Sequence, residues 1–252
     1  MSETRNACVH CKINEDICEL VMDNPGRSNA LSYPLLEDLS EKLAIARQEK
    51  VRVVILSGAG HKFSAGGDFT EMTGTVADLA MDDAIEKVVH AIRAMSAPVI
   101  AAVEGPCMGG AVDIALACDL LVAGDSAVFR VPATRMGLLY NPRAMQRWQR
   151  RLSGPTLRTL LLTGEQLSAD AAFQAGVVSH VVTTGAVQSK AHELAARIMQ
   201  GTPDAVAATK GLLLALETGE AKLDEWEAIR RDILASPERA ESVAKAKRSK
   251  PT

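Results

Sequence analysis

A short apolar strand, a glycine-rich turn and a helix of small residues follow one another in residues 98–119, PVIAAVEGPCMGGAVDIALACD. The strand is expected over residues 99–103, and Gly109 and Gly110 lie where it gives way to the helix. Glycine at this point lets a ligand approach the backbone closely. The first N–H groups of a helix have no partner within it, and the helix dipole favours negative charge there. The segment therefore predicts a backbone site that stabilises an anion.

The rest of the chain alternates strand and helix patterns over its first two-thirds and is helical after that. Alternating runs at 9–13 and 18–22 predict a β-hairpin. Nearly unbroken apolar runs predict strands covered on both faces at 51–56 and 120–122, and shorter runs predict strands at 127–131 and 177–182. Helices are expected at 34–48, 78–95, 145–151, 155–162, from a cap at Ser168 to Gly176, and at 187–200, 203–217, 224–233 and 238–246. We therefore expect an α/β fold of stacked parallel sheets flanked by helices, with a helical C-terminal region.

Composition limits the class of protein. The chain has 252 residues, 47% of them hydrophobic, and a net charge of −3, which indicates an ordinary globular protein without a nucleic-acid partner. The polar N-terminus lacks a signal-peptide pattern, and no apolar run reaches the about 18 residues of a membrane helix. We expect a cytoplasmic protein with free thiols and no membrane partner. A basic cluster near the C-terminus is either a solvated tail or a patch for a phosphate; it comprises Lys245, Lys247, Arg248 and Lys250.

The cysteines do not predict a metal centre. Cys8 and Cys11 have the spacing of half a zinc site, but no second pair of ligands follows at the spacing such sites require. We therefore expect no metal. The histidines, Trp148 and the buried-type cysteines likewise show no pairing that indicates chemistry.

Four segments together resemble the crotonase family, the enoyl-CoA hydratases and isomerases, in order and at the usual spacings. They are NPGRSNALS (24–32), FSAGGDFTEM (63–72), GPCMGGAVDIALACDLLVAG (105–124) and LTGEQLSADAAFQAGVVSHVV (162–182). The resemblance covers almost the whole chain. It implies a crotonase-like spiral of ββα units with an acyl-CoA site over residues 1–187. It further implies a helical region over 188–252 for capping and for assembly into a trimer or a hexamer built as a dimer of trimers.

The resemblance also implies how the site works. Enzymes of this family bind the thioester oxygen of an acyl-CoA with two backbone N–H groups and stabilise the enolate that forms. By motif position these donors are Gly67 and Gly110, which agrees with the place of Gly110 at a helix start. One such donor is typically worth about 10²–10³ in rate. Asp68 is interpreted as a structural turn carboxylate.

The hydratases of the family add two glutamates that hold a water molecule between them, and here the correspondence fails. The first position is Asp113, and the second is Ala133, whose methyl group cannot transfer a proton. The acid of some isomerases matches Asn141. Isomerase or decarboxylase chemistry is therefore expected rather than standard hydration. Asp113 is either an acid or base or a carboxylate that stabilises the first helical turn, because burial raises its pKa and the helix N-terminus lowers it.

Residues 132–141 also resemble the methylmalonyl-CoA decarboxylase branch of the family. Decarboxylation needs no general base once the enolate is stabilised. Tyr140 is then expected to hydrogen-bond the departing carboxylate or to help reprotonate the enolate, or else to line the acyl pocket. That branch has a histidine where this chain has Gly67.

The substrate side of the site follows from the same motifs. Arg27, Ala30 and Leu31 match the segment that holds the adenosine end of coenzyme A, and the Ala65 backbone is expected near the adenine. Coenzyme A enters as part of the substrate, and no separate cofactor is expected. A non-catalytic acyl-CoA-binding protein is the alternative function. The remaining residues predicted to contact the substrate are Gly66, Ala133 and Asn141.

Overall fold

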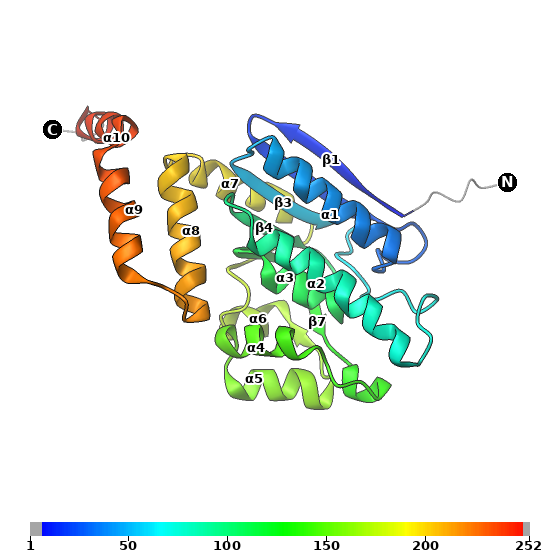
Figure 1. Cartoon of the computed structure of the whole chain (residues 1–252). Coiled ribbons are helices and arrows are strands. Elements are labelled where there is room, and N and C mark those ends of the chain that lie inside the picture. Colours follow the sequence, from blue (N-terminus) through cyan, green and yellow to red (C-terminus); the bar gives the residue numbers. More distant parts are fainter. Residues whose placement is uncertain (1–6, 249–252) are drawn as a thin grey trace.

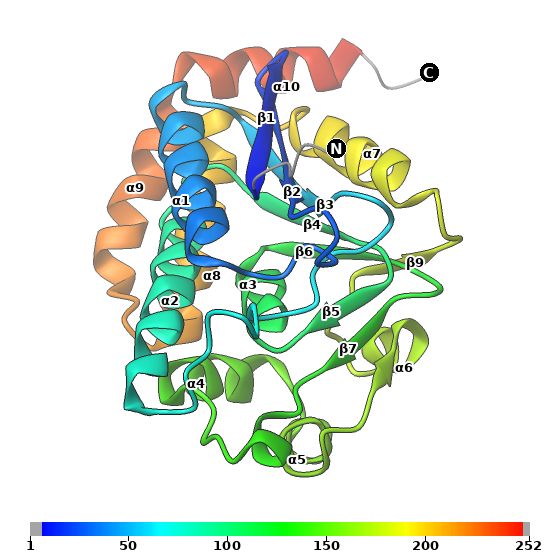
Figure 2. The same cartoon turned by 90° about the vertical axis from the view of Figure 1, so that its right-hand side faces the viewer.

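A six-stranded sheet forms the centre of the computed structural model, which describes residues 7–248 (Figures 1 and 2). The strand order is β1-β2-β3-β4-β6-β9; β1 and β2 are antiparallel and the other neighbours are parallel. The predicted hairpin and the mostly parallel sheet are therefore confirmed. The strands are β1 (Cys8–Asn14), β2 (Ile17–Asp23), β3 (Val53–Gly58), β4 (Val99–Val103), β6 (Leu120–Gly124) and β9 (His180–Val182).

A smaller sheet of three strands lies beside the first (Figure 2), and its first strand, β5, follows β4 in the chain. Its strands are β5 (Pro106–Met108), β7 (Val128–Arg130) and β8 (Leu167–Ser168). β5 pairs with β7 in parallel and β7 with β8 in antiparallel fashion. The sequence did not predict β5 or β8, because strands of three and two residues are too short to show a period.

Helices cover both faces of the large sheet. Side chains of a strand alternate between faces, so Val54 and Leu56 of β3 face the main core with α1, α2 and α3, while Val53 and Ile55 face α7. Ser32 caps α1 as predicted, its hydroxyl accepting a bond from the Leu35 amide at 3.4 Å. The helices on these two faces are α1 (Tyr33–Gln48), α2 (Leu79–Arg93), α3 (Gly110–Ala117) and α7 (Val187–Ile198).

The C-terminal helices contact the core less. α7 packs against the sheet and contributes Val187, Ala191 and Leu194 to the smaller core cluster. α8 buries Lys210, whose Nζ lies 2.8 Å from Asp119 Oδ2, whereas α9 and α10 bury no residue. Figure 1 shows α9 and α10 standing apart from the sheet. These helices are α8 (Pro203–Thr218), α9 (Leu223–Ala235) and α10 (Pro237–Arg248). None of the helices within residues 7–248 has the length and apolar character that crossing a bilayer requires.

Three elements after β7 differ from the sequence-based expectation: α4, the helix expected at 155–162, and β9. α4 begins three residues early, at Pro142, because Asn141 caps it and proline suits a first helical position. The helix expected at 155–162 divides into α5 and a π-helical turn that ends at Gly164, a glycine with φ of +61°. The strand expected at 177–182 is shorter. The elements are α4 (Pro142–Arg151), α5 (Gly154–Arg158), the π-helical turn η3 (Thr159–Thr163) and α6 (Ala169–Gln174), and 3₁₀ turns lie at η1 (Val76–Asp78) and η2 (Ala133–Met136).

Candidate active site

Two glycine segments that are distant in the sequence lie against each other before α3. Ser64 and Cys107 form a parallel bridge, in which the Ser64 amide donates to Pro106 O at 3.0 Å and the Met108 amide donates to Ser64 O at 3.0 Å. Gly66 has φ of +88°, and a β-carbon on it would lie 2.8 Å from Met108 O. Only glycine therefore permits this approach of the two backbones. The approach places Gly67, one residue after Gly66, and Gly110, two residues after Met108, on adjoining segments.

The amides of Gly67 and Gly110 donate to no acceptor within residues 7–248. Leu31 bridges the residues on either side of Gly67: its amide donates to Gly66 O at 2.7 Å, and its carbonyl accepts from Asp68 at 3.0 Å. Gly110 is the first residue of α3, so its N–H has no partner in the helix. Both predicted donors are thus backbone N–H groups with unused hydrogen-bonding capacity.

Apolar side chains surround the two amides. A β-carbon on Gly110 would collide with Ile85 Cδ1 of α2 and come within 3.5 Å of Leu31 Cδ1. A β-carbon on Gly67 would lie 2.6 Å from Met72 Cε and 4.0 Å from Met81 Cγ. Ile85, Leu31 and Met81 are buried. Charge that develops on an oxygen between these amides is poorly screened, and donors fixed in such surroundings stabilise it strongly.

Asp113 is engaged on both of its oxygens. Asp113 is buried, with only 3% of its surface exposed. Oδ1 accepts from Trp148 Nε1 at 2.8 Å, and Oδ2 accepts from Arg147 Nη2 at 2.7 Å. Burial raises the pKa of Asp113, while the Arg147 charge and the bonds from Trp148 and Arg147 oppose that rise. These contacts favour the structural interpretation of Asp113, as part of the packing between α3 and α4.

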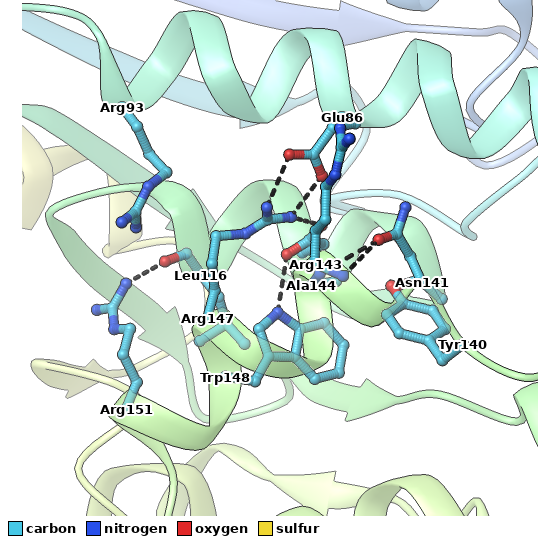
Figure 3. Close-up of polar contacts among 12 residues, drawn as sticks. Glu86, Arg93, Leu116, Tyr140, Asn141, Arg143, Ala144, Arg147, Trp148 and Arg151 are labelled. Atoms are coloured by element: carbon cyan, nitrogen blue, oxygen red, sulfur yellow. Dashed lines mark hydrogen bonds and ion pairs between the residues drawn. The ribbon is translucent and has the colours of Figure 1, made fainter. Parts of the chain in front are cut away.

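Arg147 links this carboxylate to a second one on α2. Its Nη1 and Nη2 donate to the two oxygens of Glu86 at 2.8 Å each, a bidentate pair (Figure 3). The Arg147 side chain is only 14% exposed. The sequence did not point to Arg147, Trp148 or Glu86. Trp148 is four residues after the buried Ala144 on one face of α4, which is the one local sign that its indole faces inward.

Tyr140 lies beside this cluster and reaches the glycine turn. Its hydroxyl donates to Gly109 O at 3.2 Å. Its ring centroid lies 4.9 Å from that of Trp148, with a 40° angle between the planes, and Figure 3 shows the two side chains near each other. Burial, together with the charges of Asp113 and Asp82, raises the pKa of Tyr140 well above its ordinary value. The phenol therefore remains a hydrogen-bond donor at neutral pH.

The other two acid positions hold no acid. Ala133 is buried at the start of η2. Asn141 is the N-cap of α4: its Oδ1 accepts from the amides of Arg143 and Ala144 at 2.9 and 3.3 Å (Figure 3). The sequence did not anticipate this capping role. In this structure the carboxamide oxygen of Asn141 is occupied by its own helix.

The residues predicted to hold coenzyme A cluster around Gly66 and Gly67. Arg27 Nη1 donates to both oxygens of Asp68 at 2.8 Å, and the Arg27 side chain is 48% exposed. Although burial raises it, the bonds from Thr70 and Arg27 hold the pKa of Asp68 below its ordinary value. The Ala65 amide donates to Ser28 O at 2.9 Å, which ties the segment after Ala65 to residues 24–32. The bonds of Asp68 to Arg27 and Thr70 are those of a structural carboxylate, while the contact of this segment with coenzyme A stays a prediction.

Other features lie away from this place. Lys245, Lys247 and Arg248 are on α10, remote from α3 in Figures 1 and 2, and Lys250 lies outside the described residues. A cavity of about 620 Å³ lies between α8 and the sheet; within the described part of the chain its lining includes Asp119, Lys210 and Leu213 and none of the predicted site residues.

Two cysteines of the N-terminal hairpin contact each other, and the third, Cys8, has its Sγ 4.0 Å from His10 Nε2. Cys11 Sγ lies 3.8 Å from Cys18 Sγ, and burial followed by the Cys11 neighbour raises the pKa of Cys18 to about 12. His10 Nε2 lies 3.0 Å from Asp23 Oδ2. Among the residues described, no three His, Cys, Asp or Glu side chains gather in a way that would hold a metal ion.

The chain is similar to known proteins over most of its length. A family model described as enoyl-CoA hydratase/isomerase matches residues 12–248. The 2,3-dehydroadipyl-CoA hydratase of Escherichia coli K12 is 31% identical over 209 residues, covering 81% of this chain and 82% of that protein. A carnitinyl-CoA dehydratase of Escherichia coli is 31% identical over 205 residues, covering 80% and 78%. The crystal structure of an enoyl-CoA hydratase from Bacillus anthracis superposes with a TM-score of 0.86 at 27% identity, covering 98% and 97% of the two chains.

Proposed function

Because the chain belongs to the enoyl-CoA hydratase/isomerase family, we propose that it converts an acyl-CoA thioester through an enolate whose oxygen accepts hydrogen bonds from the Gly67 and Gly110 amides. Both N–H groups lack an acceptor within residues 7–248, and their surroundings are apolar. A thioester oxygen that becomes anionic is the kind of group such a pair of donors stabilises. This is the feature of the site on which the proposal depends.

We propose further that the reaction is decarboxylation or double-bond isomerisation rather than hydration. The observation that carries this step is the state of the two acid positions: Asp113 has both oxygens bonded, and Ala133 has no proton to give. Hydration by the family's usual route needs two carboxylates that share a water. To act as a base toward a substrate, Asp113 would have to give up a bond from Arg147 or Trp148, both of which its oxygens accept inside the protein.

Decarboxylation avoids this difficulty. The bond between the α-carbon and the carboxylate carbon breaks, CO₂ leaves, and the electron pair moves onto the thioester oxygen as the enolate forms. A proton from solvent then returns to the α-carbon. No carboxylate base takes part in these steps, and the two amides stabilise the negative charge that develops on the thioester oxygen. Decarboxylation is therefore the better supported of the two reactions.

The remaining parts of the proposal concern what binds and where. Arg27, Ala30, Leu31 and Ala65 hold the coenzyme A portion of the substrate, and no other cofactor is required. The helices α8 to α10 supply the surface for a trimer or a dimer of trimers, and the protein works in the cytoplasm.

The test uses three substrates with one protein preparation. Methylmalonyl-CoA, a 3-enoyl-CoA and crotonyl-CoA are each incubated with the full chain, and products are followed by mass. Loss of CO₂ from the first is expected to be fastest, a double-bond shift in the second slower, and addition of water to the third slowest. Crotonyl-CoA hydration faster than both other conversions would overturn the preference.

A non-catalytic acyl-CoA-binding protein is the second candidate. It is favoured by the same fact that neither acid position offers an unpaired carboxylate. Conversion of none of the three thioesters, together with saturable coenzyme A binding measured by calorimetry, would select this function. Conversion of any one of them would exclude it.

A further inference from the structure

Tyr140 holds the carbonyl of the peptide unit that carries the Gly110 N–H. The Tyr140 hydroxyl donates to Gly109 O at 3.2 Å. That carbonyl and the Gly110 N–H belong to one peptide bond, which is planar and trans, so the two groups point in opposite directions. Fixing the direction of the Gly109 carbonyl therefore fixes the direction of the Gly110 N–H.

The orientation of the Gly109–Gly110 peptide plane depends on hydrogen bonds from other residues. It joins two glycines, and Gly109 has φ of +52° and ψ of −124°, a conformation that residues with a side chain rarely adopt. Glycine moves between backbone conformations at low cost, so neither residue by itself prevents rotation of the peptide plane. The Gly109 carbonyl accepts one further bond, from the Val112 amide at 3.0 Å, and the Gly109 amide donates to Arg130 O at 2.8 Å. The Tyr140 hydroxyl adds the side-chain hydrogen bond to these two backbone bonds of Gly109.

The bond has an electronic effect as well as a geometric one. A hydrogen bond received by a peptide carbonyl polarises the peptide unit and makes its N–H a better donor, by about 10–30% per bond. The pKa of the half-buried phenol is raised, so it keeps its proton around neutral pH and this contribution does not change there.

Tyr140 is itself held by the buried cluster. Its ring packs on Trp148, the Trp148 indole donates to Asp113, and Asp113 pairs with Arg147, which pairs in turn with Glu86 on α2. These contacts run from α2 through α4 to the glycine turn at the start of α3. A carboxylate at position 113 is therefore explained by the bonds it accepts from Arg147 and Trp148, without a role in proton transfer.

We propose that Tyr140 is a positioning residue, which orients the Gly109–Gly110 peptide so that the Gly110 N–H points at the thioester oxygen. This inference depends on the proposed function, because it assumes that the oxygen is bound there. It differs from a role of Tyr140 toward a departing carboxylate: a phenol has one proton to donate, and here that proton goes to Gly109 O.

The test measures the polarisation of a substrate carbonyl that has no carboxylate beside it. Propionyl-CoA labelled with ¹³C at the thioester carbon is bound to the full chain, and the carbonyl stretch is recorded by infrared difference spectroscopy. In the wild type we expect the band to move to lower frequency than in free propionyl-CoA. In Tyr140→Phe we expect a smaller displacement. We also expect kcat for methylmalonyl-CoA to fall about tenfold with KM nearly unchanged, less than the about 10²–10³-fold cost of losing an oxyanion donor outright.

Tyr33→Phe is the matched control, since Tyr33 is the other tyrosine of the chain and lies on α1. It is expected to leave the band and kcat at wild-type values. Site-specific replacement of Tyr140 by 3-fluorotyrosine keeps the shape and makes the phenol a stronger donor, so the displacement should equal or exceed that of the wild type. This second variant keeps the test valid if Tyr140→Phe does not fold.

The outcomes separate the inference from the function it assumes. A wild-type displacement that is unchanged in Tyr140→Phe overturns the inference and leaves the amide pair in place. Loss of turnover of methylmalonyl-CoA with an unchanged propionyl-CoA band also overturns it, and assigns the phenol to the substrate carboxylate. Absence of any displacement in the wild type overturns the proposed function itself.

Discussion

Arg147 Nη2 lies 2.7 Å from Asp113 Oδ2, and this contact joins helices α4 and α3 inside the protein. The carboxylate is almost wholly buried, and the same guanidinium binds Glu86 with both of its terminal nitrogens. A single cation thus neutralises part of the charge of two carboxylates from different helices. Removal of Arg147 would leave two carboxylates without their cation, whereas removal of Asp113 leaves Arg147 paired with Glu86.

Asp113→Asn is therefore expected to destabilise the protein while sparing the chemical step. The carboxamide keeps the shape but replaces one accepting oxygen by an NH₂ group, so one of the buried donors Arg147 and Trp148 loses its acceptor, and we expect the free energy of unfolding to fall by about 1–3 kcal/mol. Urea unfolding measures this loss. Release of CO₂ from methylmalonyl-CoA measures the chemistry and should continue. Glu227→Gln, which removes an exposed pair with Arg230, is the control and should cost under about 1 kcal/mol. Abolished turnover in a stable Asp113→Asn variant would instead make Asp113 the acid or base.

The Arg27–Asp68 pair predicts a pH dependence of stability. The pKa of Asp68 is below its ordinary value of 3.8, so its stabilising contribution is fully present above that value and is lost as the pH falls through the folded-state pKa. In Asp68→Asn no carboxylate titrates. The stability advantage of the wild type over this variant should thus be constant from pH 7 to about pH 5 and shrink below pH 4, as measured by urea unfolding at each pH. An advantage that grew on acidification would contradict the pairing.

Gly110→Ala tests the space beside the predicted donor. Its β-carbon would overlap Ile85 Cδ1, and inserting a methyl group into a packed core costs about 1–3 kcal/mol. We expect turnover to fall as the amide is displaced. Ile85→Ala makes room, so the double variant should recover part of the turnover lost in Gly110→Ala, beyond the sum of the single effects. Strictly additive effects would indicate that Ile85 does not set the position of Gly110.

Gly66→Ala and Gly26→Ala separate backbone strain from steric overlap. Both glycines have positive φ, +88° and +76°, so both substitutions carry a strain of about 1–2 kcal/mol. A β-carbon on Gly26 meets nothing within 4 Å, whereas one on Gly66 lies 2.8 Å from Met108 O. Thermal unfolding should therefore show a larger loss for Gly66→Ala, and only that variant should also weaken turnover. Equal losses would mean that the two glycine segments are less tightly apposed than this structure has them.

Local sequence signals predicted the parts of the fold that depend on neighbouring residues. Ser32 before the apolar face of α1, and Gly109 and Gly110 before α3, are signals of this kind, and the structure places the helix starts there. β8 could not be foreseen because its two residues form a strand only by pairing with β7, which lies 40 residues earlier at Val128↔Ser168. Its existence depends on tertiary contact rather than on periodicity.

The same distinction holds at the candidate site. Gly67, Gly110 and Asp113 were identified by motif position, but the partners of Asp113 were not. Arg147 and Trp148 are 34 and 35 residues away, and only the packing of α4 on α3 brings them to the carboxylate. The direction of the Asp113 pKa shift was open for a related reason: it depends on the degree of burial, which a sequence pattern does not measure.

The place of Gly110 at the head of α3 bears on how such a protein can change its chemistry over generations. An N–H belongs to every amino acid but proline, so any other substitution of Gly110 keeps the proposed donor and can only tilt or crowd it. The function of a side chain, by contrast, is lost with a single substitution. If the two amides bind the thioester oxygen as proposed, new reactions can arise by exchange of a few side chains around a main chain that keeps both donors.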